Sequence, residues 1–276
     1  MNANRASAKF NVRHPLSTIE STLLSSLSSR HKKIFTLKDV QDTLKVTYEN
    51  AKTIVNRLIQ KGWLIRLTPG KYLIIPLEAG VNSNYSEPGY VIASHLASPY
   101  YIAYGSALNY HGLTDRVPPF IYVATTQRRR DRTILYNSYK FVTIVNQKMF
   151  GTTTIMISDT SVKISDPEKT IIDCLDRPEY CGGFEEIAKT LYYDQKKLDT
   201  NKLIEYAKKQ GNKTILKRLG FLFEKYQDKR SINQLNDLAL SEGYSKLDPN
   251  KPNKGHHNTR WKLIENIDYM KWDWMQ

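Results

Sequence analysis

Cysteine is scarce in this sequence, since only Cys174 and Cys181 occur among 276 residues. Two cysteines are too few for the disulfide scaffold of a small secreted domain, and they lack the additional ligand pairs that a structural zinc site needs. We therefore expect both cysteines to be reduced residues that pack in the interior.

Long hydrophobic runs are also absent: no stretch of about eighteen consecutive apolar residues occurs, so no membrane-spanning helix is expected. The basic residues Arg5, Lys9 and Arg13 precede only a short Leu23-Leu24 island, which is not the apolar core of a secretory signal. These features predict a cytoplasmic protein. A composition of 40% hydrophobic and 11% aromatic residues is typical of a folded chain, and its length favours two domains.

The formal net charge of +14 is concentrated at the two ends of the chain. Residues 1–80 hold 13 Lys and Arg against 5 Asp and Glu (+8), residues 81–194 hold 11 against 12 (−1), and residues 195–276 hold 17 against 10 (+7). Clustered positive charge is typical of a polyanion-binding surface, although lysine-rich helices are often simply solvated. A neutral middle between basic flanks fits a scaffold with two polyanion-facing surfaces.

The beginning of the chain predicts two helices in succession. Leucines and isoleucines at four-residue spacing indicate a helix over about 16–30. Thr36-Leu37-Lys38-Asp39 has the pattern of a capping box, which starts a second helix at Leu37. A brief turn at Lys45-Val46-Thr47 follows, and Thr47 is the expected N-cap of the next helix.

A third helix is predicted from Tyr48 to about Lys61, ended by Gly62. Its apolar residues recur at the spacing of a one-sided helix and are Ala51, Ile54, Val55, Leu58 and Ile59. The opposite face then carries polar side chains that can donate to bases or phosphates. With the two residues that begin the helix, the candidate DNA contacts are Thr47, Tyr48, Glu49, Asn50, Lys52, Thr53, Asn56 and Arg57, with Gln60 beside them.

Two short strands, Trp63–Leu67 and Lys71–Ile75, flank Thr68-Pro69-Gly70-Lys71, where proline and glycine specify a type II turn. This hairpin is the expected wing of a winged helix-turn-helix, with Arg66 and Lys71 placed to contact phosphates. The caps, the short interhelical turn, the polar third helix and the local charge agree on DNA binding. The alternative is a winged helix that serves as a protein–protein module.

The remaining sequence predicts a second domain. The polar stretch 81–89 is the expected linker, and the domain begins near Tyr90. It starts with a helix to about Leu96 and a short helix at Ser106–Tyr110. Strands are expected at 120–125, 139–145, 153–158 and 161–165. A helix capped by Asp166 follows, and further helices are expected at 183–193, 200–210, 213–226 and 231–242. The last thirty residues, with Trp261, Trp272 and Trp274, predict a short packed segment or a partner contact.

Several runs resemble the AbiEi family of antitoxins from type IV toxin-antitoxin and abortive-infection systems. The runs are GWLIRLTPGKYLI, YYIAYGSALNYHGLTDRVPPFIYVAT and VKISDPEKTIIDCLDRPEYCGGFEEIAKTL, and the resemblance covers about residues 34–194. Its most specific parts, in order, are Gly105-Ser106-Ala107-Leu108, His111-Gly112-Leu113, Asp166-Pro167-Glu168-Lys169-Thr170 and Gly182-Gly183. The resemblance implies repression of the protein's own operon through the winged helix. It also implies neutralisation of a nucleotidyltransferase-like toxin without a need for a stable complex.

An enzymatic site is the main rival hypothesis. Gly105-Ser106 before a strand is similar to the opening of nucleotidyltransferase folds, but the strand 121–125 carries no magnesium-binding acid. His111 is more simply a packing or capping residue than a general base. Asp166 and Glu168 are explained by their position at a helix start. We therefore expect no enzymatic activity, no cofactor and no metal.

An arginine-rich loop stands out in the neutral middle of the chain. Between two expected strands, Arg128, Arg129, Arg130 and Arg132 follow Gln127. It is either a solvated loop or a second surface that contacts nucleic-acid phosphates or a partner.

Together the sequence predicts an α+β protein. An N-terminal winged helix-turn-helix (1–80) is followed by a linker (81–89) and a mixed α+β domain (90–276), whose part from about 195 is a helical extension. The expected function is that of an autorepressor and antitoxin that binds inverted repeats in double-stranded DNA of its own promoter. The alternatives are a regulator without a toxin and a nucleotidyltransferase-fold enzyme.

Overall fold

A computed structural model describes residues 13–80, 85, 87–236, 238, 240–272 and 274. Its contacts divide the chain into two compact units, of which the first comprises residues 1–96 and 133–137 and the second the remainder. The helix α4 (Gly89–Leu96) is grouped with the first unit. Within the expected linker, residues 81–84 and 86 lie outside the described residues. Helices and sheets occur in both units, so the predicted α+β class is confirmed.

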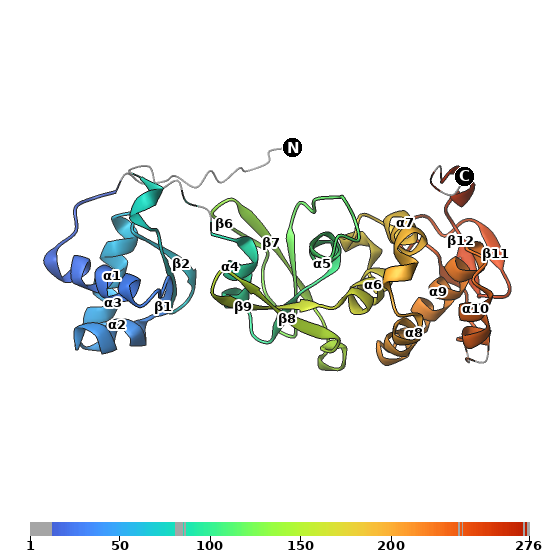
Figure 1. The fold of residues 1–276 in the computed structure, drawn as a ribbon, viewed down its shortest axis with the longest axis horizontal. Coiled ribbons are helices and arrows are strands. Elements are labelled where there is room, and N and C mark those ends of the chain that lie inside the picture. Colours follow the sequence, from blue (N-terminus) through green and yellow to red (C-terminus); the bar gives the residue numbers. More distant parts are fainter. Residues whose placement is uncertain are drawn as a thin grey trace. The chain divides into compact units, whose positions relative to one another are not determined.

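The first unit contains four helices and a small antiparallel sheet (Figure 1). In chain order its elements are α1 (Thr18–Ser29), β1 (Ile34–Thr36), α2 (Leu37–Leu44), α3 (Tyr48–Gln60), β2 (Leu64–Thr68), β3 (Lys71–Ile74), the 3-10 turn η1 (Leu77–Ala79) and α4. The strand order is β1-β3-β2, with Leu64 opposite Ile74 and Ile34 opposite Leu73. The predicted helix and strand boundaries are confirmed to within two residues.

The helix N-caps predicted from the sequence are present in the structure. The Thr36 amide donates to Asp39 Oδ2 (2.7 Å) and Thr36 Oγ1 accepts from the Asp39 amide (3.4 Å). Thr47 Oγ1 accepts from the Asn50 amide (3.4 Å). Between the two helices Lys45 takes a left-handed conformation with φ of 55°, which turns the chain sharply from α2 into α3.

A buried carboxylate joins the first and third helices. Glu20, 2% exposed, accepts from Lys61 Nζ (2.6 Å) and from the Ser17 amide (2.7 Å). Burial alone would raise the pKa of Glu20, but these hydrogen bonds lower it below the ordinary value. Around this pair the three helices enclose an apolar core of Leu23, Leu27, Phe35, Val40, Ala51, Val55, Leu58 and Tyr72.

A six-stranded mixed sheet is the centre of the second unit, except that its residues Thr133–Asn137 are grouped with the first unit (Figure 1). Its strands are β4 (Tyr100–Ile102), β5 (Ile121–Thr125), β6 (Arg132–Ile134), β7 (Asn137–Thr143), β8 (Thr152–Ile157) and β9 (Thr160–Ser165), in the order β6-β7-β5-β4-β9-β8. Pairing is parallel for β5 with β7 and β4 with β9, and antiparallel for β4 with β5 and β8 with β9. Helix α5 (Tyr104–Tyr110) packs on β5.

Helices dominate the chain after the sheet. They are α6 (Pro167–Asp176), α7 (Phe184–Asp194), α8 (Thr200–Lys209), α9 (Lys213–Lys225) and α10 (Lys229–Asn236), with short 3-10 turns at η3 (Pro178–Tyr180) and η4 (Gln195–Lys197). The helix expected at 231–242 was placed wrongly. It starts earlier because Asp228 accepts from the Ser231 amide (3.1 Å), and residues 238 and 240–242 are not helical.

The C-terminal segment forms a second, three-stranded sheet that sequence patterning did not predict. Its strands are β10 (Ser245–Lys246), β11 (His256–Asn258) and β12 (Leu263–Glu265), in the order β10-β12-β11, followed by the 3-10 turn η5 (Tyr269–Lys271). In Figure 1 the helices α7–α9 lie on the side of α6 away from the large sheet, with β11 and β12 beside α9 and α10. Trp261 and Trp272 are buried in this part, as expected of a packed segment.

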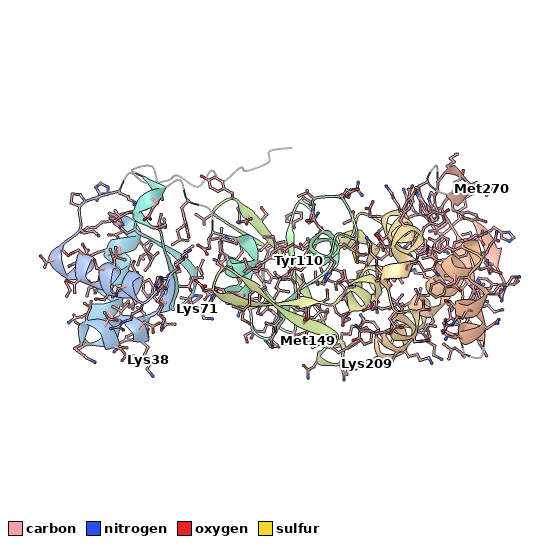
Figure 2. The ribbon with its side chains drawn as sticks, in the orientation of Figure 1. Lys38, Lys71, Tyr110, Met149, Lys209 and Met270 are labelled. Atoms are coloured by element: carbon pink, nitrogen blue, oxygen red, sulfur yellow. A yellow bond between two sulfur atoms is a disulfide. The ribbon has the colours of Figure 1, made fainter. Side chains whose placement is uncertain are left out.

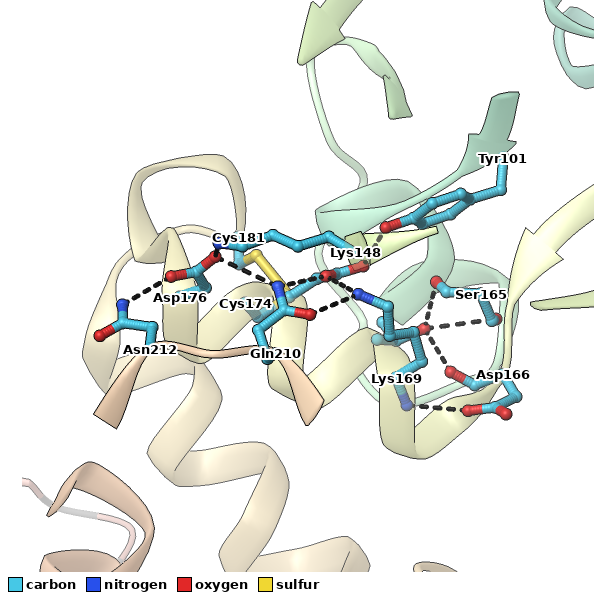
Figure 3. Close-up of polar contacts among 12 residues, drawn as sticks. Tyr101, Lys148, Ser165, Asp166, Lys169, Cys174, Asp176, Cys181, Gln210 and Asn212 are labelled. Carbon is cyan, nitrogen blue, oxygen red and sulfur yellow. Dashed lines mark hydrogen bonds and ion pairs between the residues drawn. A yellow bond between two sulfur atoms is a disulfide. The ribbon is translucent and has the colours of Figure 1, made fainter. Parts of the chain in front are cut away.

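A buried polar network fastens α6 to the helices that follow (Figure 3). Lys169 and Asp173, 0% and 1% exposed, form an ion pair, and the side chain of Gln210 contacts both. Tyr101 Oη, from β4, donates to Asp173 Oδ2 (2.9 Å). Burial raises the pKa of Asp173, while Lys169 and Tyr101 oppose that effect. The network therefore joins the large sheet, α6 and the end of α8 through one set of hydrogen bonds.

The expectation of two reduced cysteines was wrong. Cys174 in α6 and Cys181 after η3 form a disulfide, with Cα atoms 5.8 Å apart (Figure 3). The physical reason is local: the chain turns at Arg177-Pro178 immediately after α6, and this turn returns Cys181 to disulfide distance. Two cysteines cannot form a scaffold, but they can close one short loop.

Reduction of this disulfide should destabilise the protein. Opening so short a loop adds entropy to the unfolded chain, and we expect the free energy of unfolding to fall by about 2 kcal/mol. Urea unfolding with and without dithiothreitol measures the change. The Cys181→Ser variant is the control and should show no effect of reductant; an equal effect on this variant would contradict the assignment.

Candidate nucleic-acid interface

The outward face of α3 is the first candidate surface. Ala51, Ile54, Val55 and Leu58 are buried, so the rotation of the helix is fixed. This burial leaves every polar residue predicted as a DNA contact exposed: Thr47, Tyr48, Glu49, Asn50, Lys52, Thr53, Asn56 and Arg57. Tyr48 is 51% exposed despite its aromatic ring.

Most of these polar side chains are available for an external ligand. In the described part of the chain, no carboxylate lies within ion-pair distance of Lys52 or Arg57. Thr47 is used as the N-cap, and Thr53 Oγ1 donates to the Glu49 carbonyl (2.9 Å). The structure therefore brings Lys52, Asn56 and Arg57 together on one helix face and gives Thr47 and Thr53 local roles.

The β2–β3 hairpin carries the other two predicted contacts. Gly70 has φ of 78°, as the third position of a type II turn requires. Arg66 is exposed and lies opposite Tyr72, with its guanidinium carbon 5.8 Å from the Tyr72 ring centroid. Lys71 is the chain neighbour of Tyr72 and is half-buried, so it projects to the other face of the hairpin. Arg66 and Lys71 thus lie on opposite faces.

In Figure 2 the labelled Lys38 of α2 extends outward from its helix.

The arginine-rich loop between β5 and β6 is exposed at Arg128, Arg129, Arg130 and Arg132. The Asp131 carboxylate is committed elsewhere: it accepts from the Phe141 amide (3.0 Å) and pairs with Lys140 Nζ (3.1 Å). The hydrogen bond from Lys140 to Asp131 and the negative charge of Asp131 raise the pKa of Lys140. Arg129 is held by Gln127 Oε1 (2.6 Å), and the described residues supply no acidic partner for the four arginines.

The two carboxylates at the start of α6 are structural. Asp166 Oδ1 accepts from the Lys169 amide (2.8 Å), which confirms the predicted N-cap. Glu168 accepts from Lys202 Nζ (2.7 Å) and from the Asp199 amide (3.0 Å). Burial alone would raise the pKa of Glu168, but Lys202 and the amide lower it. Both side chains therefore hold α8 against α6.

His111 also has a packing role, as predicted. One ring nitrogen, Nε2, lies 2.7 Å from the Ser165 carbonyl oxygen, which ties the end of α5 to the end of β9. Strand β5 carries no acid, and the described residues contain no group of three or more His, Cys, Asp or Glu arranged to hold a metal ion.

One open groove of about 690 Å³ lies between the loop 112–116 and α7. Its walls carry charges of both signs, and Thr114 and Arg116 both contact Glu186. The described residues that line it include no histidine, cysteine or serine. Arg116 of this groove is paired with Glu186, unlike the two cations of α3.

Comparisons with known proteins agree with the division of the chain. Residues 23–75 match the family model described as "Transcriptional regulator, AbiEi antitoxin", and residues 101–225 match the model described as "AbiEi antitoxin C-terminal domain". The chain belongs to the AbiEi family. The first match contains α2, α3 and the hairpin, and the second contains the buried network and the arginine-rich loop.

Structure comparison adds one relative of the same fold. The crystal structure of the RV2827C protein from Mycobacterium tuberculosis superposes with a TM-score of 0.66 at 16% identity, covering 94% of each chain. At this identity the likeness shows the fold alone. No curated protein matches the chain. Within the described residues, no helix is both long and apolar enough to cross a membrane.

Proposed function

We propose that this AbiEi-family protein represses its own promoter by binding inverted repeats in duplex DNA through a winged helix-turn-helix. Helix α3 is the recognition helix, with Lys52, Asn56 and Arg57 at base edges. The β2–β3 hairpin is the wing. Because Arg66 and Lys71 lie on opposite faces of it, each contacts a different phosphate.

One observation carries the proposal. The exposed face of α3 presents two cations without acidic partners and several amide and hydroxyl groups, on a helix whose N-terminus is also exposed. A helix N-terminus attracts phosphate, and arginine, lysine and asparagine read bases in the major groove. A protein-docking helix needs an apolar face for its partner, and the apolar face of α3 is already buried in its own domain.

Removal of the two α3 cations should abolish specific DNA binding. We expect Lys52→Ala with Arg57→Ala to weaken binding to the promoter duplex by at least about 30-fold, since each contact contributes roughly 1–3 kcal/mol. Fluorescence anisotropy at fixed salt measures this. Lys189→Ala with Arg230→Ala removes the same charge from exposed sites in the second unit and should leave binding within about threefold. An unchanged affinity in the α3 variant would contradict the recognition-helix assignment.

We further propose that the arginine-rich loop is a second contact to nucleic-acid phosphates. Four exposed arginines without acidic partners favour polyanion binding over a neutral solvated loop. Arg129 is already oriented by Gln127, so less side-chain entropy is lost when it binds.

Loss of these loop contacts should appear in the salt dependence. Arg128→Gln with Arg130→Gln should reduce the slope of log affinity against log salt by about two, one unit for each phosphate released, with the sequence preference unchanged. The pair Lys189→Gln with Arg230→Gln is the charge-matched control. If the two double variants shift the slope equally, the loop makes no specific contact.

Antitoxin activity is the second half of the proposed function. The C-terminal match to an AbiEi antitoxin domain supports it, and the expected target is a nucleotidyltransferase-like toxin that need not form a stable complex. The alternative is a regulator without a toxin, because DNA binding by the first unit does not require antitoxin activity.

Co-expression tests this half directly. When a nucleotidyltransferase-like toxin encoded beside the gene arrests growth, the full chain should restore it. The Lys52→Ala, Arg57→Ala variant, expressed from an unrelated promoter, should also restore growth, because its second unit is intact. Failure of both proteins to rescue would favour the regulator without a toxin.

A further inference from the structure

The small C-terminal sheet carries an exposed aromatic platform. The rings of Tyr244 and His257 lie with centroids 4.7 Å apart and a tilt of 32°. Tyr244 is 39% exposed and His257 is exposed. Lys262 Nζ lies 5.6 Å from the Tyr244 centroid, so a cation borders the platform. The three residues come from the position before β10, from β11 and from the turn before β12.

A buried lysine adds positive charge beneath this platform. Lys217 of α9 is 0% exposed, and its ammonium donates to the carbonyls of Gly243 and Lys262. Within the described chain, no carboxylate lies within ion-pair distance of Lys217 or Lys262. Burial lowers the pKa of Lys217, and the charge of Lys262 lowers it further. Two neighbouring lysines with no carboxylate in ion-pair distance create a positive potential that favours an anion.

Three acids of this segment are engaged in structural contacts, whereas Glu242, two residues before Tyr244, is exposed. Glu265 accepts from Asn258 Nδ2 (2.8 Å), Asp248 accepts from the Asn250 amide (2.9 Å), and Glu224 accepts from Trp261 Nε1 (2.5 Å). Lys254, His256 and His257 are exposed. The surface of the small sheet therefore presents lysines, histidines and an exposed tyrosine ring.

The platform is also held rigidly. Trp261 packs directly on Gly220 of α9, where any Cβ atom would meet the indole ring at 2.1 Å. The Trp261 amide donates to Asn258 Oδ1 (2.9 Å), which fixes the turn between β11 and β12. A pre-positioned aromatic surface loses little entropy when a ligand stacks on it.

We propose that this surface binds single-stranded nucleic acid, with a base stacked on the outer face of the Tyr244–His257 ring pair and an adjoining phosphate on Lys262. Stacking requires an unpaired base, so a duplex cannot use the platform. Acidic peptides and anionic lipids would use the lysines but not the rings. The site lies in the second unit and does not depend on the proposed function of α3.

Single-strand binding by the full chain tests the proposal. Labelled oligouridine and oligothymidine of about ten nucleotides should both bind at low salt. The oligonucleotide that binds more tightly shows whether RNA or single-stranded DNA is the ligand. Tyr244→Ala should weaken binding by about tenfold or more, whereas Tyr244→Phe keeps the ring and should retain it. Tyr193→Ala, at another exposed tyrosine, is the matched control and should change nothing.

The outcomes separate this site from the duplex-binding surface. Lys52→Ala with Arg57→Ala should leave single-strand affinity unchanged, and Tyr244→Ala should leave duplex affinity unchanged. The proposal is overturned if the full chain binds neither oligonucleotide, or if Tyr244→Ala binds as well as the natural protein while its thermal unfolding is normal. Polyglutamate is a polyanion without bases. If the natural protein and the Tyr244→Ala variant both bind polyglutamate tightly, and the variant also keeps its single-strand affinity, charge alone attracts the ligand.

Discussion

The buried ion pair between Lys169 and Asp173 is the interaction on which the larger unit depends. Removing two charges from water is costly, and the pair is stable there only because Gln210 and Tyr101 complete its hydrogen bonds. These partners come from β4 and from the end of α8, so the network ties α6 to both. The matched AbiEi C-terminal domain, residues 101–225, contains the whole network. That arrangement explains why the sheet and the helices after it form one unit.

Local signals in the sequence were reliable because local physics decides them. Thr36, Thr47 and Asp166 each cap a helix whose unpaired amides need an oxygen, and all three do so in the structure. The buried stripe of α3 likewise follows from apolar spacing, and it alone sets which side chains face outward. The candidate DNA contacts could therefore be placed on one surface from the sequence, although their binding of DNA stays a prediction.

Features that depend on the direction of a turn or on strand register escaped sequence reasoning. The Cys174–Cys181 disulfide follows from a turn at Arg177-Pro178, whose direction no composition rule specifies. The small sheet β10–β12 has strands of two or three residues, too short to show alternation. The opposite orientations of Arg66 and Lys71 depend on the register of the hairpin. In each case the missing information was the three-dimensional path of the chain.

The charge of the C-terminal segment shows why cations must be sorted by their contacts before they are assigned to a surface. Lys202 is paired with Asp166 and Glu168, and Lys246 donates to the Pro249 and Lys251 carbonyls. Arg218 is buried against backbone carbonyls, and burial lowers its pKa to about 10. These cations stabilise the fold and attract no ligand. Among the cations that remain for a polyanion, Lys262 lies beside exposed rings, and this position makes an unpaired base a better fit than a duplex.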